Sequence, residues 1–274
     1  MSEYKKIHGI HIQALASDPS NLGSGQVWYN TTSNQLKITA VSTTGAWATG
    51  GNMGTGRGSL AGAGTQTAGL AFGGKISPPP ATNATEHYDG STWTAGGNMG
   101  TGRYYLGSAG TQTAGLAFGG STYIATEHYD GSAWTSGGNL GTGRYRLSGA
   151  GTQTAGLGFG GYDGSDDTNA TEHYDGSVWT AGGNMGTARY GLGGAGTQTA
   201  GLAFGGYPSA GNNATEHYDG SAWTAGGNMG TGRGDLGGVG TLSAGLAFGG
   251  EWPTINVTEE YDGPGITTQI CSSS

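Results

Sequence analysis

Residues 68–97 read "AGLAFGGKISPPPATNATEHYDGSTWTAGG", and near-copies of this stretch begin at residues 114, 155 and 200, with a shortened copy at 244. The copies keep the double glycine, the "ATEHYDGS" segment and the following tryptophan. They differ between the double glycine and "ATE", where the chain reads "KISPPPATN", "STYI", "YDGSDDTN", "YPSAGNN" and "EWPTIN". The repeat therefore fixes most positions and leaves one short segment free to vary.

The repeat length indicates a β-propeller. Tryptophans fall at Trp47, Trp93, Trp134, Trp179 and Trp223, which are 46, 41, 45 and 44 residues apart. That period is typical of a four-stranded blade, and the 62 glycines of the 274 residues disfavour helices. Within one unit we expect strands at about 68–74, 84–90, 91–97 and 104–112, separated by Gly-, Asp- and Thr-rich turns.

The alternation within the first of these strands suggests how blades pack. Leu70 and Phe72 point to one face, while Gly69, Ala71 and Gly73 point to the other. A face of large residues can then seat against the small-residue face of the next blade. This packing explains why the copies are so similar, since each must fit its neighbour.

Counting the segments predicts the architecture: an all-β, five-bladed propeller with four strands per blade. There are five "FGG" segments and five "YDG" segments that follow "TEH" or "TEE", but the array begins with a "W…GGN" segment and stops after the last "YDG". We therefore expect residues 46–263 to form the propeller, with residues 46–66 supplying the third and fourth strands of the last blade. A ring closed in this way would hide its edge strands.

The order of double glycine, tyrosine, tryptophan and arginine resembles the kelch repeat, whose hallmarks are a double glycine, a later Tyr and then Trp. The resemblance covers residues 46–263 and occurs five times in order. It implies a β-propeller that works by binding. Kelch domains are often six- or seven-bladed, whereas this chain holds five units.

Composition narrows the classes of function. The formal net charge is −8 with only ten Lys and Arg, so a basic nucleic-acid surface is not expected. No apolar run reaches membrane-spanning length, and the first twenty residues lack a signal-peptide pattern. The lone Cys271 excludes a disulfide framework within one chain. We expect no cofactor and no membrane insertion.

Residues 1–45 lie outside the ring and are expected to form an arm. "QVWYN" and "QLKITAV" read as two strands joined by the turn "TTSN". The stretch "DPSNLGSGQVWYNTTSNQLKI" resembles a short hairpin common near the ends of bacteriophage virion proteins, and the whole chain resembles Gly-rich kelch-like structural proteins of marine and cyanobacterial phages. The resemblance implies a virion location, attachment to other virion proteins through the arm, and several copies per particle. Residues 264–274 are expected to be a tail.

The variable segments are the candidate binding surface. In a four-stranded meander they share one face of the disc, while both chain ends leave on the other, uniform face. They could contact a host-surface glycan or protein, and they could equally vary because nothing constrains them. The candidate binding residues are Lys75, Ile76, Tyr123, Tyr162, Asp163, Asp166, Asp167, Tyr207 and Trp252.

Residues repeated in every blade are predicted to be structural. This applies to the tryptophans named above, to Arg57, Arg103, Arg144, Arg189 and Arg233, and to Glu86, Glu127, Glu172, Glu216 and Glu259. Each Arg is expected to pair with a carboxylate or backbone carbonyls of its blade. The repeated histidines lie in separate blades and cannot converge on one metal ion.

The sequence thus predicts a non-enzymatic virion protein, since no unique set of catalytic residues stands out from the repeats. A tail-fibre or tail-tip module that contacts the host is the first hypothesis. A capsid decoration or vertex protein is the alternative within phages, and a non-viral kelch scaffold that binds a protein partner is the alternative outside them.

Overall fold

The computed structural model describes residues 13–17, 27–38, 49–77, 80–121, 123–207, 212–251 and 256–263. The chain divides into two compact units, Met1–Thr49 and Gly50–Ser274. Trp47, Trp252 and the predicted tail at 264–274 fall outside the described residues.

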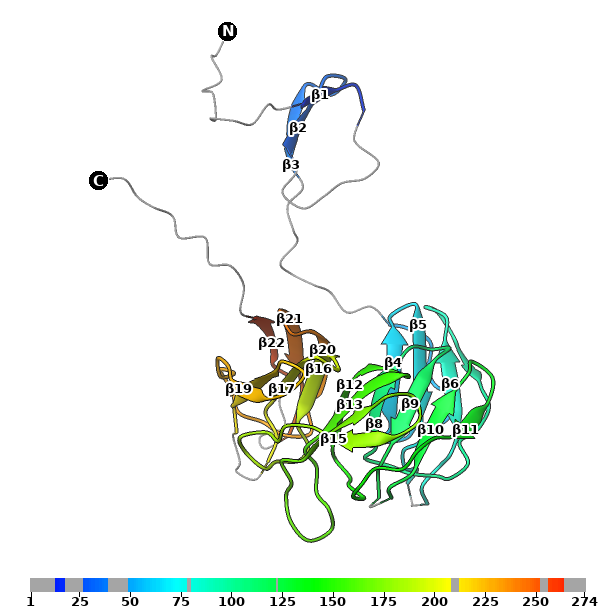
Figure 1. Ribbon diagram of the computed structural model, residues 1–274. Coiled ribbons are helices and arrows are strands. Elements are labelled where there is room, and N and C mark those ends of the chain that lie inside the picture. Colours follow the sequence, from blue (N-terminus) through cyan, green and yellow to red (C-terminus); the bar gives the residue numbers. More distant parts are fainter. Residues whose placement is uncertain are drawn as a thin grey trace, which may run out of the picture. The chain divides into compact units, whose positions relative to one another are not determined.

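The second unit is a five-bladed β-propeller of antiparallel sheets (Figure 1). Blade 1 contains β4 (Ala61–Thr65), β5 (Ala68–Phe72), β6 (Thr85–Tyr88) and β7 (Trp93–Ala95). Blade 2 contains β8 (Gly107–Gly110), β9 (Gly115–Phe118), β10 (Thr126–Tyr129) and β11 (Trp134–Ser136). Blade 3 contains β12 (Ser148–Thr152), β13 (Ala155–Phe159), β14 (Thr171–Tyr174) and β15 (Trp179–Ala181).

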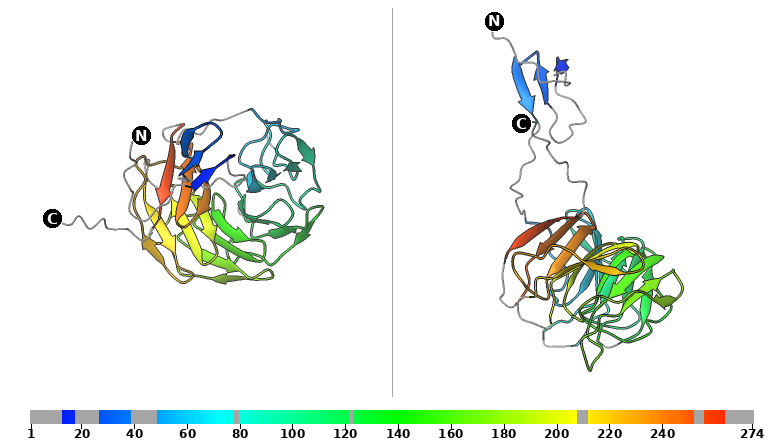
Figure 2. Two further views of the ribbon diagram at one scale, coloured as in Figure 1. Left: turned by 90° about the horizontal axis from the view of Figure 1, so that it is seen from above. Right: turned by 60° about the vertical axis from the view of Figure 1, so that its left-hand side comes forward.

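Blade 4 contains β16 (Gly193–Thr197), β17 (Ala200–Phe204), β18 (Thr215–Tyr218) and β19 (Trp223–Ala225). Blade 5 contains β20 (Gly237–Thr241), β21 (Ala244–Phe248) and β22 (Thr258–Asp262). Figure 2 shows the sheets arranged around one axis, and the first strands of all five blades line a single cavity along it. The fold class predicted from the repeat is confirmed.

The grouping of strands into blades differs from the sequence prediction. The "GSAG"-type strand was expected to end a blade, but it begins the next one: β8 pairs with β9, and β4 pairs with β5. The turns "GTQTA" are tight two-strand hairpins, which favour pairing between the strands they join. The segment 61–65 therefore belongs to blade 1, and the other strand predicted for blade 5, which begins near Trp47, falls on residues that the structure does not describe.

The first unit contains the predicted hairpin and one strand that the sequence did not reveal. β2 (Val27–Asn30) pairs antiparallel with β3 (Gln35–Ile38), and β1 (Gln13–Leu15) adds to β2 in parallel. The Asn30 side chain accepts hydrogen bonds from the backbone N–H groups of Thr32 and Ser33, at 3.0 and 2.9 Å. This Asx turn fixes the reversal between the strands.

Neighbouring blades contact each other through three repeated interactions. First, a leucine of one blade seats on a glycine of the next; a Cβ added to Gly115 would lie 2.7 Å from Leu70 Cδ2. Second, a histidine bonds to the next blade's tyrosine, as His128 Nε2 does to Tyr174 Oη at 2.6 Å. Both contacts recur at the four junctions that join blade 1 to 2, 2 to 3, 3 to 4 and 4 to 5, so they hold consecutive sheets together.

The third interaction is made by the tryptophans. Trp179 Nε1 donates to Thr126 Oγ1 at 2.9 Å, and its ring lies against Phe118 with centroids 4.8 Å apart. Trp134 and Trp223 repeat the arrangement one blade before and one blade after. Each tryptophan thus covers the apolar face of the preceding blade while its only donor is satisfied.

The turns at the uniform face form hydrogen bonds within each blade and between neighbouring blades. The Asp89 carboxylate accepts the backbone N–H groups of Thr92 and Ser91, which lowers its pKa. Gln112 Nε2 donates across the junction to the carbonyls of Gly69 and Tyr88 in the preceding blade. Repetition on this face therefore follows from hydrogen bonds that every blade needs.

Both described ends of the propeller unit lie at this uniform face (Figure 1). Gly51 lies directly against the Ser91 carbonyl in the β6–β7 turn, and Gly263 N–H donates to the Ser243 carbonyl in the β20–β21 turn at 3.1 Å. The variable segments lie at the opposite end of the axis.

A buried ion pair joins each blade to the connector that precedes it. Arg144 Nη2 lies 2.6 Å from Glu172 Oε1, and Arg144 Nη1 donates to the carbonyls of Gly160 and Ala170. The other carboxylate oxygen of Glu172 accepts the Gly141 N–H at 2.7 Å. Equivalent pairs join Arg57 to Glu86, Arg103 to Glu127, Arg189 to Glu216 and Arg233 to Glu259.

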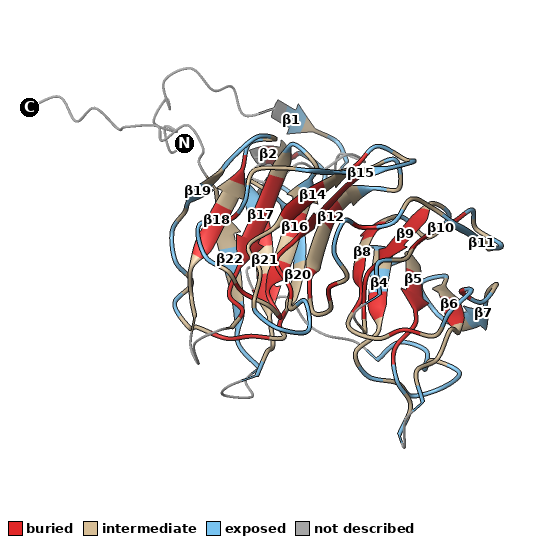
Figure 3. Ribbon diagram, turned by 60° about the horizontal axis from the view of Figure 1, so that its bottom comes forward, coloured by how far each residue is buried: buried red, intermediate tan, exposed pale blue. Residues whose placement is uncertain are grey.

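Blade 5 is less protected than the other blades. Thr85, Thr126, Thr171 and Thr215 are buried, whereas the equivalent Thr258 is exposed. Val239 of β20 is 52% exposed, and Figure 3 shows β20 and β22 paler than the matching strands of blades 2 to 4. The sheet of blade 5 has three strands within the described residues.

We expect Arg144→Ala to lower the free energy of unfolding by about 3–5 kcal/mol, because Glu172 would remain buried without its cation. Chemical denaturation measures the loss. The Arg144→Ala/Glu172→Gln double variant should recover part of it. Arg233→Ala should cost less, since the Glu259 side chain is 24% exposed. Equal losses at the two sites would contradict this assignment.

We expect the melting temperature to fall as the pH drops from about 7.5 to 5.5. Burial lowers the pKa of His128, His173 and His217, so the folded chain binds fewer protons than the unfolded chain below pH 6.5 or so. The stabilisation is present above the unfolded pKa and is lost below it. Replacing the three histidines by Gln should flatten the dependence, and an unchanged slope would refute this explanation.

Candidate functional site

A ring of backbone residues in the left-handed conformation surrounds the axis at the variable face. Ser59, Tyr105, Arg146, Gly191 and Asp235 all have φ between 48° and 61°. Consecutive members are hydrogen-bonded, from Tyr105 N to Ser59 O at 2.9 Å through to Asp235 N to Gly191 O at 2.7 Å. The repeat thus places one residue per blade at the axis, in a conformation that disfavours side chains.

Four of these five positions carry a side chain although the conformation suits glycine. Gly191 shows that glycine fits the position, yet the other blades hold Ser, Tyr, Arg and Asp. A non-glycine residue in this region costs on the order of 1 kcal/mol. Retained strain of this kind, at residues that do not repeat, points to a role for the side chains themselves.

These residues belong to cavities stacked along the axis. The axial cup, our name for the cavity lined by Lys75, Tyr104, Tyr105, Ser121, Tyr145, Arg146, Tyr162 and Tyr190, has a volume of about 690 Å³. A second cavity of about 340 Å³ adjoins it, lined by Asp235 and Glu251 among others. The leucines of that cavity also border the channel between the first strands. A volume of this size is in the range of small-molecule sites.

Six tyrosines form an arc around the cup from blade 2 to blade 4. Successive ring centroids along Tyr104, Tyr105, Tyr145, Tyr162, Tyr190 and Tyr207 lie 5.4, 6.4, 5.4, 5.9 and 4.9 Å apart. All six are half-buried. Such rings offer rigid apolar faces together with hydroxyl groups.

Two cations lie over this arc and differ in their partners. The Arg146 guanidinium lies 4.3 Å from the Tyr105 ring centroid, donates to Tyr105 Oη at 2.9 Å and pairs with Asp235 at 3.3 Å. Lys75 Nζ lies 5.5 and 5.2 Å from the centroids of Tyr104 and Tyr105. Lys75 is exposed, and within the described part of the chain no carboxylate pairs with it. Its ammonium group is therefore open to a ligand.

Burial and neighbouring charges also shift the pKa values of two tyrosines and of Asp235 at the axis. Burial alone would raise the pKa of Tyr105, but hydrogen bonds from Ser59 and Arg146 and the Arg146 charge bring that pKa below its usual value. Burial, reinforced by Asp235 and Glu251, raises the pKa of Tyr207 to about 12. Burial raises the pKa of Asp235 against the opposing effect of Arg146. The axial cup thus has the cation Lys75 in its lining, and the adjoining cavity has the acidic groups Asp235 and Glu251.

The structure brings together some of the binding residues that the sequence suggested. Lys75 and Tyr162 line the axial cup, and Tyr207 stacks on Tyr190 at its edge. Ile76 and Tyr123 do not line it, and Tyr123 is 47% exposed.

The acidic loop at residues 162–169 is stabilised by hydrogen bonds within itself. Asp163 accepts the backbone N–H groups of Ser165 and Asp166, while Asp166 is exposed and Asp167 half-buried. Trp252 lies outside the described residues.

The sequence prediction missed Ser121 of the cup and six residues that lie between the repeated Arg and the next Leu: Tyr104, Tyr105, Tyr145, Arg146, Tyr190 and Asp235. The signal was present, because the residues between the repeated Arg and the next Leu read "GS", "YY", "YR", "YG" and "GD". They vary as much as the loops do, but lie in a segment that was read as an ordinary strand. Short bridges such as Tyr145–Tyr162 and Tyr190–Tyr207 bring this segment against the variable loop.

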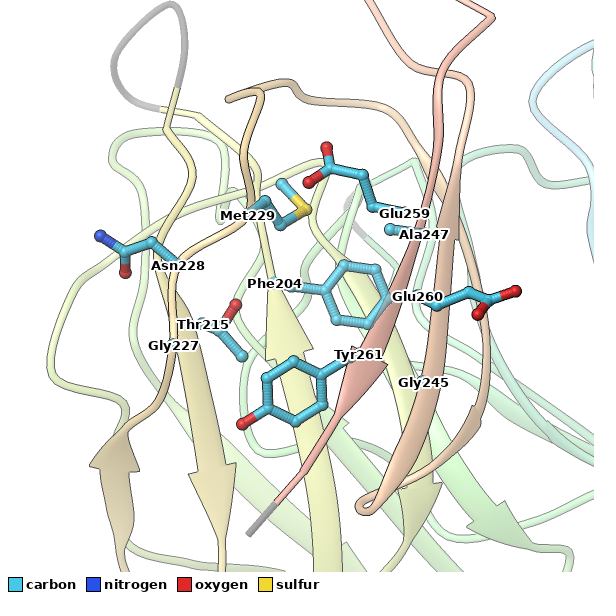
Figure 4. A pocket seen from close by; sticks show the side chains of 10 residues that line it. All are labelled: Phe204, Thr215, Gly227, Asn228, Met229, Gly245, Ala247, Glu259, Glu260 and Tyr261. Carbon is cyan, nitrogen blue, oxygen red and sulfur yellow. The ribbon is translucent and has the colours of Figure 1, made fainter. Parts of the chain in front are cut away.

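A smaller cavity of about 70 Å³ lies between blades 4 and 5 (Figure 4). Phe204, Thr215 and Tyr261 line it, and Figure 4 shows these three side chains close together around it. At other junctions the matching residues hold a tryptophan: Phe159 and Thr171 hold Trp223, which also packs on Tyr218. The cavity thus repeats a structural slot and is not the candidate ligand site.

Among the described residues no cluster of three His, Cys, Asp or Glu side chains could hold a metal ion. The described chain contains no helix that is long and apolar enough to cross a membrane.

No model of a known protein family matches this sequence, and no curated protein sequence is significantly similar to it.

We expect Trp47 to fill the slot of Figure 4 and to complete blade 5. Gly50 lies against the Tyr88 hydroxyl as Gly96 lies against that of Tyr129, and Trp47 precedes Gly50 in the sequence by the same spacing as Trp93 precedes Gly96. Trp47→Ala should therefore destabilise the propeller by about 3–5 kcal/mol. Thermal melting measures the effect.

The control is Trp28→Ala, which removes a buried tryptophan of the first unit and should leave the propeller transition unchanged. A Trp47→Ala propeller that melts like the wild type would show that the slot does not hold this residue.

Proposed function

We propose that this protein is a non-enzymatic binding module of a bacteriophage particle, in which the propeller displays the axial cup and the variable loops to a host surface. One observation carries the proposal. The side chains that depart from the repeat gather around one end of the axis, at positions of unfavourable backbone conformation, while the other end repeats.

The chemistry of the cup supports binding over catalysis. Its described lining is tyrosine, serine, one lysine and one arginine, and the arginine is already engaged by Asp235 and Tyr105. These groups stack and hydrogen-bond, and none forms a nucleophile–base pair with another. Rigid aromatic groups on a rigid scaffold are typical of recognition surfaces.

The path of the chain supports display. Gly50 and Gly263 lie at the uniform face, so the covalent links to both flanking segments start at the end opposite to the cup. The hairpin of β2 and β3 contains the "VWYNTT" segment whose resemblance to phage virion proteins suggests attachment to the particle. An arm held by other virion proteins would leave the cup free.

A tail-fibre or tail-tip position fits this role best, because a host-contacting surface must face away from the particle. A capsid decoration protein and a non-viral kelch scaffold would use the same fold. They differ in location, which makes location the decisive measurement.

We expect antibodies against the propeller to label the tails of purified phage particles in electron micrographs. Labelling of the capsid shell would replace the tail assignment with the decoration role. Particles without label, and protein found only in cell extracts, would reject the virion proposal.

We also expect the purified protein to compete with particles for the host and so reduce adsorption. Tyr145→Ala/Tyr162→Ala should lose this effect, because both rings belong to the cup. Val178→Ser, at an exposed turn of the uniform face, is the control and should block as well as the wild type does. If the tyrosine variant also blocked adsorption, the cup would not be the contact surface.

A further inference from the structure

We infer that the axial cup binds an acidic carbohydrate, whose sugar rings stack on the tyrosine arc and whose carboxylate is held by Lys75. The inference rests on the proposed function in one respect, since it names the ligand class of the same site. It needs no assumption about where the protein is located.

The lining of the cup favours a sugar over a peptide. None of its eight residues is an aliphatic or phenylalanine side chain. A peptide is usually anchored by apolar side chains that enter dry, apolar pockets. The leucines nearest to this site, such as Leu106 and Leu147, are buried below the rim, 7% and 5% exposed. Tyrosine, in contrast, offers a flat face for the C–H groups of a sugar and a hydroxyl for its oxygens.

The orientation of the rings suits an extended, hydroxyl-rich ligand. Neighbouring rings meet at angles from 28° at Tyr190–Tyr207 to 75° at Tyr162–Tyr190. They therefore do not stack into one closed column, and several faces remain available along the arc. A single planar aromatic ligand would use only one of them, whereas an oligosaccharide can use several in turn.

The charge argument identifies the ligand as acidic. Arg146 is held by Asp235 and Tyr105, so it positions the Tyr105 ring. Lys75 is exposed, lies over two rings and has no carboxylate partner among the described residues. In a chain of net charge −8, general attraction to anions is not expected. A single free cation inside a tyrosine cup instead selects one carboxylate at one place.

A nucleic acid does not fit the same features. Its affinity depends on neutralising many phosphates, and the described cup has one free cation with Asp235 and Glu251 beyond it. An acidic oligosaccharide carries one carboxylate for every one or two sugar rings, whereas a nucleic acid carries a phosphate at every nucleotide. The single free cation of the cup matches the lower charge density of the oligosaccharide better.

The experiment is a glycan array that carries uronic-acid oligosaccharides beside their neutral counterparts, probed with the purified full chain. We expect the wild type to bind at least one acidic oligosaccharide and to bind its neutral counterpart at least about tenfold more weakly. Lys75→Met should remove the preference for the acid. Lys75→Arg, which keeps the positive charge at the same place, should keep it.

A second pair of variants tests stacking. Tyr145→Ala should weaken both acidic and neutral glycans, whereas Tyr123→Ala, a tyrosine outside the cup, should weaken neither. Melting curves of the Lys75 and Tyr145 variants confirm that they fold. Titration with salt should weaken the acidic glycan only.

Several results would overturn the inference: no acidic glycan bound, equal binding of acid and neutral partner, an unchanged preference in Lys75→Met, or retention of acidic peptides in place of glycans. None of these results changes the expected antibody labelling of particles, and a failure of that labelling would not change the expected glycan-array result. The ligand class and the proposed location can therefore fail separately.

Discussion

The close approach of neighbouring sheets is the constraint on which this structure depends. Leu70 reaches the glycine at 115 so closely that no larger residue fits without displacement, and Phe118 meets Gly149 and Gly158 of the next blade in the same way. This contact needs a bulky side chain on one face and none on the other. The high glycine content is therefore what allows the blades to pack at the normal density of a protein interior. The His–Tyr, Trp–Thr and Gln–carbonyl bonds then fix the register of sheets that are already in contact.

The same constraint divides the molecule into an end that repeats and an end that does not. Turns at the uniform face carry hydrogen bonds from one blade to the next, so Gln112 and its equivalents cannot vary freely. At the other face, buried ion pairs such as Arg144–Glu172 fix the arginine of each connector. The residue two positions after that arginine lies at the axis, where blade packing does not require a particular side chain. The repeats therefore differ in sequence only at positions where contacts between blades do not require the same residue.

Much of this could be predicted from the sequence, and the exceptions have physical causes. Periodicity gave the blade number and the alternation gave the seating of Leu70 on glycine, because both depend on local pattern. The assignment of residues 61–65 to blade 5 was wrong, since a repeat has no natural starting point and only the pairing of β4 with β5 decides it. β1 was not foreseen because its three residues carry no period. The tyrosine arc was missed because its members come from different repeats, and only the ring brings Tyr105, Tyr145 and Tyr190 together.

The equivalence of the junctions has a consequence for how such a surface could diversify. Blades 2 and 3 offer the same leucine, glycine, tyrosine and tryptophan to their neighbours, while each carries its own axial residue and its own loop. Exchanging two whole repeats would thus preserve these four kinds of contact and yet permute the side chains that line the axial cup. A gene built of such cassettes can shuffle its binding surface by recombination between copies, without a single new point mutation.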